Sequence, residues 1–282
     1  MRKIFWSLAA LMLMAAPVMT SCSKDLDEEQ TKGNIVTLTI APPTNKAETR
    51  ATVDGSTLKI TGWELNDEVI LYNAYISPGD EMSPAGYFSS ISGDGVTFKC
   101  INAANGTFSG TLPEGKTLAD YSLAVFGATA TTKDNQIHLI PTTKCSSALK
   151  DVVMMAALKS GDSYTMQVVN CVMKLNNSTG SAMEVSWSGK TSSGLGPYFF
   201  TPEIRYEEKW MGVDVYDGGW ANSHFTLPSG VCYINMCLQG HWYDSWGIAK
   251  EDGTQVIERK AVGDDRSYGR AIGKLFNAGT IN

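Results

Sequence analysis

Histidine and basic residues are scarce in this sequence. Its 282 residues include three histidines, which are scattered and show no Cys/His spacing of the kind that binds zinc: His138, His224 and His241. No Cys-x-x-Cys pair is present either, so we expect no zinc site. Lys and Arg number 23 against 29 Asp and Glu, giving a net charge of -6 and a pI near 5.1. Because no basic cluster follows Lys3, binding to nucleic acid is not expected.

Sequence motifs of catalysis are also missing. There is no Gly-x-Ser-x-Gly nucleophile elbow, and the histidines lack local partners for a catalytic triad. Phosphate loops, calcium loops and cofactor fingerprints are absent as well, so we expect neither an enzyme nor a bound cofactor or metal. The carboxylates of the second half are numerous, but a solvated loop face explains them better than a glycosidase pair. These are Glu203, Glu207, Glu208, Asp214 and Asp217.

The first residues have the pattern of a lipoprotein export signal. Two basic residues follow Met1, the stretch 4–18 is almost entirely apolar, and the small residues Thr20 and Ser21 directly precede Cys22. Such a stretch is too short to remain as a membrane span, and small residues mark a cleavage point. We expect residues 1–21 to be removed as a signal peptide and Cys22 to carry acyl chains that anchor the protein. The alternative is an ordinary cleaved signal with Cys22 merely nearby.

Residues 22–33 are expected to form an acidic tether. The run 25–29 has no apolar periodicity that a core could bury, which is typical of a solvated segment. It resembles the acidic signal that sends many Bacteroidota lipoproteins to the cell surface, although Leu26 interrupts the acids. No later apolar run is long enough to cross a membrane as a helix. We therefore expect a surface-exposed position on the cell outer membrane, with the lipid on Cys22 as the anchor.

Five cysteines remain once Cys22 is assigned to the lipid: Cys100, Cys145, Cys171, Cys232 and Cys237. An odd number cannot all pair with one another, so at least one is free or bonded to a partner. Small buried thiols are the simplest interpretation, because cysteine is among the residue types most often fully buried. The sequence leaves open which of them are paired.

Short segments of alternating apolar residues predict an all-β protein. Turn residues recur roughly every 8–12 residues, which is the spacing typical of a β-sandwich or barrel. In residues 34–41, Val36, Leu38 and Ile40 share one face, and two prolines end the strand. Further strands are expected at 57–60, 68–73, 96–100, 106–112, 122–129, 136–140, 163–175, 183–187, 221–227, 231–238, 255–261 and 275–281.

Two segments are harder to assign. Residues 148–159 could form a helix or a buried strand, and residues 189–220 are irregular. A lapse into small and polar residues at 142–150 indicates a domain boundary. We expect an N-terminal domain at 34–148 and a C-terminal domain at 149–282.

Several passages resemble one known family in their order along the chain. Thr49-Arg50 comes before a turn and then Trp63-Glu64-Leu65-Asn66-Asp67 leads into a strand, which resembles the opening of the fimbrillin-like proteins. Asn66 stands where that family usually has glycine, and asparagine tolerates the left-handed conformation that glycine would supply. The resemblance spans residues 34–282, and the passages that follow in the same order are 106–110 with Tyr121, 151–156 and 273–279.

The resemblance implies two tandem β-sandwich domains of Greek-key, transthyretin-like topology, and a role as a stalk, tip or anchor subunit of a pilus. In polymerising members a protease cuts after an arginine, the first strand leaves, and a strand of another subunit fills the groove by β-strand addition. Here the cut would fall between Arg50 and Ala51, and the leaving strand would be 35–41. The alternative is that Arg50 is a solvated loop residue and the first strand stays in place.

The C-terminal end bears on the role. Residues 275–281 have the pattern of a last strand, and no further apolar segment follows that could be lent to another subunit. We therefore expect a chain that accepts a strand more easily than it donates one. The resemblance then implies a tip or accessory subunit of a fimbrium that acts in cell adhesion.

Aromatic residues concentrated in the second half allow another function. Exposed aromatic platforms flanked by polar groups suit contact with sugars, so a freestanding carbohydrate-binding surface lipoprotein is the alternative, with a host or bacterial glycan or protein as partner. The rings could instead pack between the domains, because aromatics dominate cores. The candidate ligand contacts are Trp210, Trp220, Trp242, Tyr243 and Trp246.

Overall fold

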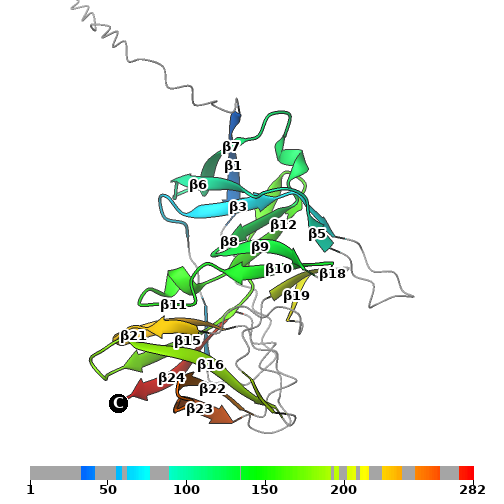
Figure 1. The fold of residues 1–282 in the computed structure, drawn as a ribbon. Helices are drawn as coiled ribbons and strands as arrows, with labels where there is room; N and C mark the ends of the chain where they lie inside the picture. The colour runs from blue at the N-terminus through cyan, green and yellow to red at the C-terminus, as the bar shows by residue number, and fades with distance from the viewer. Residues whose placement is uncertain are drawn as a thin grey trace, which may run out of the picture. The chain divides into compact units, whose positions relative to one another are not determined.

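The computed structural model describes residues 33–41, 55–58, 62–76, 89–133, 135–191, 194–196, 202–207, 210–215, 224–236, 245–260 and 273–282. Over these residues the protein is all-β, as the sequence predicts, and its only helical elements are two short 3-10 helices (Figure 1). Neither of these described helices is long and apolar enough to cross a membrane.

The strands are β1 (Asn34–Ala41), β2 (Gly55–Thr57), β3 (Glu68–Tyr72), β4 (Ala74–Ile76), β5 (Ser89–Ile91), β6 (Val96–Asn102), β7 (Thr107–Leu112), β8 (Leu123–Phe126), β9 (Ala128–Lys133), β10 (Gln136–Pro141), β11 (Cys145–Ser146), β12 (Met155–Ser160), β13 (Ser163–Thr165), β14 (Gln167–Val168), β15 (Cys171–Asn177), β16 (Met183–Thr191), β17 (Gly194–Gly196), β18 (Pro202–Glu207), β19 (Trp210–Val215), β20 (His224–Leu227), β21 (Gly230–Met236), β22 (Ser245–Lys250), β23 (Gln255–Lys260) and β24 (Lys274–Ile281). The 3-10 helices are η1 (Leu118–Asp120) and η2 (Leu149–Val152).

The largest sheet has eight strands in the order β13-β1-β7-β6-β3-β8-β12-β14. β13 also pairs with β12, next to the far end of the sheet, so β13 connects β1 with β12; β1 lies between β7 and β13. Side chains of a strand alternate between its two faces. In β6, for example, Phe98 and Cys100 are buried while Thr97 and Lys99 are exposed.

The first core lies on one face of this sheet and is centred on aromatic rings. The ring of Trp63 meets that of Phe108 edge to face at a centroid distance of 5.0 Å, and it meets that of Phe126 at 5.5 Å. Both are favourable geometries for aromatic pairs. Leu38 and Ile40 of β1 belong to the same cluster, so the first strand is part of this core.

Central strands of the sheet are buried on both faces. All four residues of β8 are buried; Ala124 and Phe126 join the first core, while Leu123 and Val125 join a second one. A continuous apolar run is typical of a strand covered on both sides. The second core includes Ile137 of β10, which belongs to the four-stranded sheet β19-β18-β10-β9. β4 and β5 form a two-stranded sheet.

Two five-stranded sheets contain most of the C-terminal strands. One has the order β11-β21-β15-β24-β2; the other has the order β17-β16-β22-β23, with β20 paired to β16. The β11-β21-β15-β24-β2 sheet is called the β2–β24 sheet below. A third core draws on both sheets and contains Cys171, Met173, Leu175, Val185, Phe225, Leu227, Cys232, Ile234, Ile248, Ala278 and Ile281.

Several sequence predictions need correction. The helix considered for residues 148–159 is wrong, because only η2 is helical there and β12 follows as a buried strand. Residues 163–175 form three short strands rather than one, since the chain passes there from one sheet to another. Residues 189–220, expected to be irregular, contain β17, β18 and β19 among the described positions. The carboxylates at Glu203, Glu207 and Asp214 therefore lie on strands rather than on a loop.

The division into domains 34–148 and 149–282 stays a prediction. The strand pairing changes sheet on both sides of residue 148: β11, before it, pairs with β21 in the β2–β24 sheet, whereas β12, β13 and β14, after it, pair within the eight-stranded sheet. β15, which starts at Cys171, is the next strand and belongs to the β2–β24 sheet. In the opposite direction, β2 leaves the N-terminal segment and pairs with β24. Strands that pair in this way with distant parts of the chain are not revealed by local sequence patterns.

Candidate functional site

The candidate site is the first strand and the groove that holds it. β1 pairs antiparallel with β7, with Asn34 opposite Leu112 and Thr39 opposite Thr107. At its other edge it pairs in parallel with β13, with Ile40 opposite Tyr164. β1 thus makes main-chain pairs with a strand on each side, and its removal would leave unpaired groups on both neighbours.

Burial along β1 follows the alternation of its sequence and deepens toward its end. Ile35 is 79% exposed, Leu38 is 8% exposed and Ile40 is completely buried. Val36 is partly buried and packs against the first core. The strand therefore has one apolar face, and its last residues contribute most of the burial.

Trp63 and Gly106 fix the end of β1. The indole N–H of Trp63 donates a hydrogen bond to the Ile40 carbonyl over 2.8 Å, and the Ile40 N–H donates to the Gly106 carbonyl over 2.9 Å. Gly106 has a φ of 66°, and a Cβ placed on it would lie 2.5 Å from the Ile40 carbonyl oxygen. Only glycine allows the backbone to approach β1 this closely.

Large side chains beside β1 would line a groove if the strand left, and they are buried while it is in place. Phe108 and Leu112 come from β7, Tyr164 comes from β13, and Trp63 and Met166 belong to the same core. The Tyr164 hydroxyl donates to the Tyr121 carbonyl over 2.7 Å. Burial raises the pKa of Tyr164 to about 12. Without β1, an apolar surface of this kind would face water, where it attracts a covering partner.

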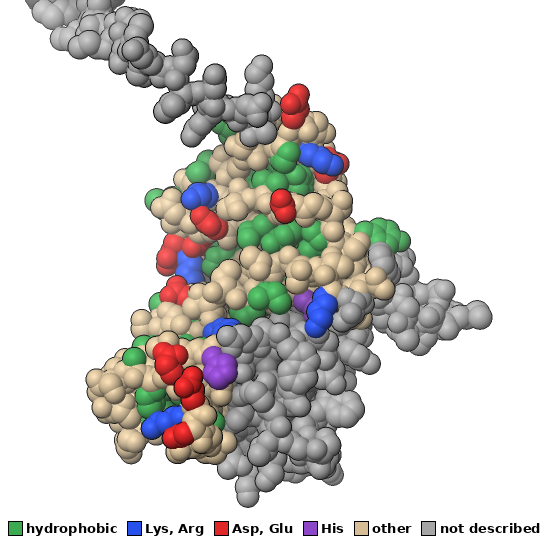
Figure 2. Space-filling view, viewed as in Figure 1, with side chains coloured by type: hydrophobic (Ala, Val, Ile, Leu, Met, Phe, Trp, Pro, Cys, Tyr) green, Lys and Arg blue, Asp and Glu red, His purple; other side chains and the backbone are tan. Residues whose placement is uncertain are grey.

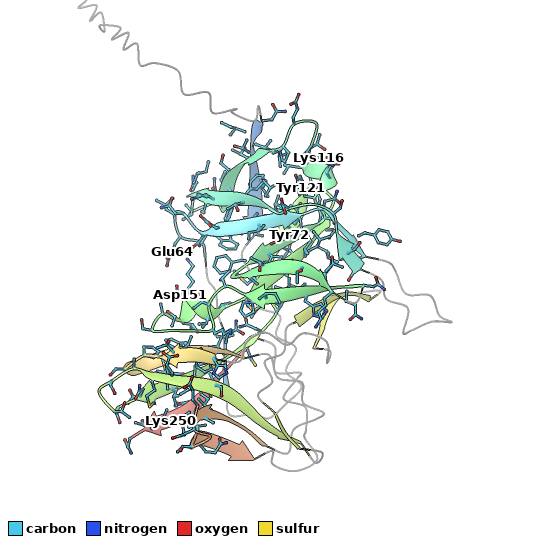
Figure 3. All side chains as sticks on the ribbon, viewed as in Figure 1. Glu64, Tyr72, Lys116, Tyr121, Asp151 and Lys250 are labelled. Atoms are coloured by element: carbon cyan, nitrogen blue, oxygen red, sulfur yellow. The ribbon has the colours of Figure 1, made fainter. Side chains whose placement is uncertain are left out.

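The turn after Trp63 is confirmed in its conformation. Asn66 has a φ of 69°, the left-handed backbone expected where the family has glycine. The Asp67 carboxylate accepts the Glu64 N–H over 2.7 Å, and the Cys100 carbonyl accepts the Asn66 N–H over 2.9 Å. The ammonium of Lys150 lies 2.8 Å from Asp67 and 3.1 Å from Glu64, which is labelled in Figure 3. This turn holds Trp63 and is tied to η2.

Residues on either side of the predicted cut belong to different sheets. β1 ends at Ala41 in the eight-stranded sheet, whereas β2 begins at Gly55 and pairs antiparallel with β24. After β2, the Leu58 N–H donates to the Gly273 carbonyl over 2.8 Å, and Leu58 is buried in the first core. The predicted cleavage residues Arg50 and Ala51 lie between these strands in the sequence and outside the described residues. The predicted lipidation residue Cys22, which precedes β1, lies outside the described residues as well.

The C-terminal strand is incorporated in the fold. β24 lies between β15, to which it is parallel, and β2, to which it is antiparallel. Ala278 and Ile281 are buried in the third core. The Ser178 N–H and its hydroxyl both donate to the Ile281 carbonyl, over 2.9 Å and 2.7 Å. The expectation that residues 275–281 form a last strand is therefore confirmed.

The predicted aromatic contacts are only partly placed. Trp210 begins β19, and Trp246 lies in β22 opposite Gly189 and Arg259, so both are strand residues. Trp220, Trp242 and Tyr243 fall outside the described residues, so the sugar-binding prediction stays untested.

Residues of the types that bind metals are spread out over the part of the chain that the structure describes. There, no group of three His, Cys, Asp or Glu residues could hold a metal ion. The face visible in Figure 2 shows acidic and basic side chains interspersed among the described residues.

Sequence reasoning found β1 but missed the second neighbour that holds it. β13 is three residues long and is separated from β1 by most of the N-terminal half of the chain. Its apolar Tyr164 gives no local sign of parallel pairing with Ile40. Gly106 was noted for its place in a motif, but its role in the approach to Ile40 depends on the folded register.

Comparison with known proteins gives distant structural likenesses. No family model matches the chain, and no curated protein matches it. A candidate cell adhesion protein from Bacteroides uniformis aligns with a TM-score of 0.36 at 14% identity, over 81% of this chain and 91% of that one. The fimbrial anchor protein Mfa2 from Porphyromonas gingivalis aligns with a TM-score of 0.30 at 11% identity, over 75% and 80%.

A variant of the major pilin from Streptococcus pyogenes aligns with a TM-score of 0.20 at 8% identity, over 88% of this chain and 98% of that one. At TM-scores this low, none of these likenesses carries an argument about function.

Proposed function

We propose that this protein is a non-catalytic, fimbrillin-like surface lipoprotein that serves as a tip or accessory subunit in pilus assembly and so acts in cell adhesion. β1 would leave after a cut between Arg50 and Ala51, and a strand of another subunit would take its place. One observation carries the proposal: β1 and β2 flank the predicted cut and pair into different sheets. A cut between them can therefore free β1 while β2 stays paired with β24.

The groove sets the chemistry of the strand that could replace β1. Such a strand must offer main-chain groups to β7 on one edge and to β13 on the other. It must also carry apolar side chains at alternate positions, to fill the places of Val36, Leu38 and Ile40. β-strand addition works in this way: main-chain hydrogen bonds supply affinity, and alternate side chains supply specificity.

Cutting the chain changes how strongly β1 is retained. Burial of side chains such as Leu38 and Ile40 contributes about 1.5–3 kcal/mol each, so β1 would remain bound after the cut until a competitor arrives. Before the cut, β1 is tethered and rebinds at a high effective concentration. After the cut, its rebinding depends on free concentration, and a strand of another subunit can displace it.

The same cut would separate the body of the protein from its anchor. Cys22, the proposed site of acylation, and β1 both precede Arg50 in the sequence. A chain that loses β1 therefore also loses the lipid that would hold it in the outer membrane. Processing and incorporation into a fimbrium would thus be linked.

The test is the N-terminal sequence and mass of the protein from cells, measured separately in the membrane-held and sheared surface fractions. A form that starts at Ala51 without lipid in the sheared fraction supports strand exchange. The matched control is Arg50→Ala, which should abolish that form and leave the chain in the membrane fraction. If the wild-type chain carries only an acylated Cys22 as its N-terminus, strand exchange is overturned and a freestanding, carbohydrate-binding surface lipoprotein becomes the better model.

A further inference from the structure

Two cysteines on neighbouring strands lie outside the groove of β1. Cys145 is the first residue of β11, and Cys232 lies in β21 of the same β2–β24 sheet. The antiparallel register pairs Cys145 with Ile234. Cys232, two positions from Ile234, is therefore a diagonal neighbour of Cys145 on the same face of the sheet.

The two thiols contact each other in an apolar environment. A side-chain hydrogen bond between Cys145 and Cys232 raises the pKa of Cys145 and lowers that of Cys232. Cys232 is completely buried in the third core, and Cys145 is half-buried against it. Both cysteines are in the thiol form in this structure.

The strand register places the other described cysteines elsewhere. Cys171 lies opposite Met236 in the ladder between β15 and β21, and Cys232 lies opposite Leu175. Cys100 belongs to the first core rather than to the third. Among the four cysteines that the structure describes, Cys145 and Cys232 are therefore the pair that the strand register brings together.

We propose that Cys145 and Cys232 form an intramolecular disulfide when the protein meets an oxidising disulfide. Cys145, the more accessible thiol, loses its proton and attacks one sulfur of the oxidant. The other oxidant sulfur leaves as a thiolate and takes up a proton. Cys232 then loses its proton and attacks the Cys145 sulfur, and the second oxidant thiolate leaves and is protonated. Two protein thiols are thereby oxidised to one disulfide, and one oxidant disulfide is reduced to two thiols.

Closure requires a small movement of β11. Diagonal neighbours on antiparallel strands have Cα atoms about 7–8 Å apart, which is just beyond the roughly 7 Å that a disulfide spans without backbone movement. β11 has two residues and lies at the edge of its sheet, held by its pairs with β21 and by the Asn235 N–H bond to the Lys144 carbonyl over 2.8 Å. A short edge strand can shift by the roughly 1 Å that remains. The bond would then link the segment before η2 covalently to β21.

Formation of this disulfide in cells rests on the proposed function, because oxidising surroundings are found outside the cytosol. The chemical step itself does not depend on whether Arg50 is cut. The disulfide proposal and the proposed function can therefore fail separately. Peptide mapping of the cysteines tests the disulfide, and the N-terminal sequence tests the cut.

The experiment treats the purified protein with oxidised glutathione, blocks remaining thiols with N-ethylmaleimide, and maps disulfide-linked peptides by mass spectrometry. Trypsin releases Cys145 in the peptide 145–150 and places Cys232 with Cys237 in the peptide 210–250; chymotrypsin, cutting after Tyr233, separates these two. We expect a linked Cys145–Cys232 pair and a rise in Tm of roughly 5 °C or more, because the bond closes a long loop.

Matched variants decide between this pair and its competitors. Cys145→Ala should abolish both the linked peptide and the rise in Tm, whereas Cys171→Ala should keep both. A link to Cys237 instead of Cys232, or a stable glutathione adduct on Cys145 with Cys232 alkylated, would overturn the proposal. Protein can also be trapped with N-ethylmaleimide directly from cells. A linked Cys145–Cys232 peptide in that sample supports the disulfide as a native modification, whereas two alkylated cysteines would show that it does not form in cells.

Discussion

Substitution of Ile40 by alanine tests the idea that the end of β1 anchors the strand. Ile40 is completely buried, whereas Ile35 on the same strand is 79% exposed. The same substitution, isoleucine to alanine, can therefore be made at a buried and at an exposed position of one strand. Ile35→Ala is the matched control, since it alters the intrinsic strand preference of β1 by the same amount.

The expected magnitude follows from the atoms removed. Isoleucine has three more carbons than alanine, and each buried methylene contributes about 0.8 kcal/mol, which gives about 2.4 kcal/mol for transfer alone. The cavity left among Trp63, Phe108 and Tyr164 adds to this, so Ile40→Ala should lower the free energy of unfolding by about 3–4 kcal/mol. Ile35→Ala should change it by no more than ~0.5 kcal/mol, because its side chain stays mostly in water.

Urea denaturation followed by far-ultraviolet circular dichroism measures both values. A second readout follows release of β1: after a protease cut in residues 42–54, the Ile40→Ala chain should lose its N-terminal fragment faster than the Ile35→Ala chain does. Equal unfolding free energies for the two variants, within ~0.5 kcal/mol, would refute the view that β1 is held mainly through its buried end. Equal rates of fragment release would refute it as well.

Two further predictions concern the surroundings of β1. Gly106→Ala should destabilise the protein by about 2–3 kcal/mol in urea titrations, because the new Cβ would meet the Ile40 carbonyl oxygen at 2.5 Å. Gly115→Ala, at a similar φ of 74° but with open space around it, should cost only ~1 kcal/mol; an equal loss would show that backbone conformation alone is responsible. Burial raises the pKa of Tyr164 to about 12, whereas an unfolded tyrosine titrates near 10, so the unfolded chain loses its proton first and stability falls as the pH rises from ~10 to ~12. Tyr164→Phe should flatten the stability profile over that range; a profile unaffected by Tyr164→Phe would assign the loss to other groups.

Prediction from sequence succeeded where a local pattern determines the structure. The strand at 34–41 has the predicted bounds, because alternation and the following prolines are both local signals. Asn66 adopts the predicted left-handed turn, since that preference belongs to the residue itself. Residues 148–159 are ambiguous because successive residues are buried at the start of β12, and a continuous apolar run has the same appearance in a helix and in a covered strand.

Prediction failed where the partner of a strand had to be known. The segment 163–175 has apolar residues throughout, yet its parts pair with β1, β12 and β21 in different sheets. Residues 189–220 contain strands that complete the sheet of β10, which lies far away in the sequence. Strand propensity depends strongly on the neighbouring strands, so such segments carry a weak signal by themselves.

The sequence alone therefore determined the all-β class, the bounds and apolar face of β1, and the turn that presents Trp63. Each of these follows from side-chain alternation or from the backbone preference of single residues. Only the tertiary structure decided that β13 closes the second edge of β1, that β2 pairs with β24, and that Cys145 lies beside Cys232. These are choices among many sterically similar strand pairings, and they are made by the packing energy of the whole core.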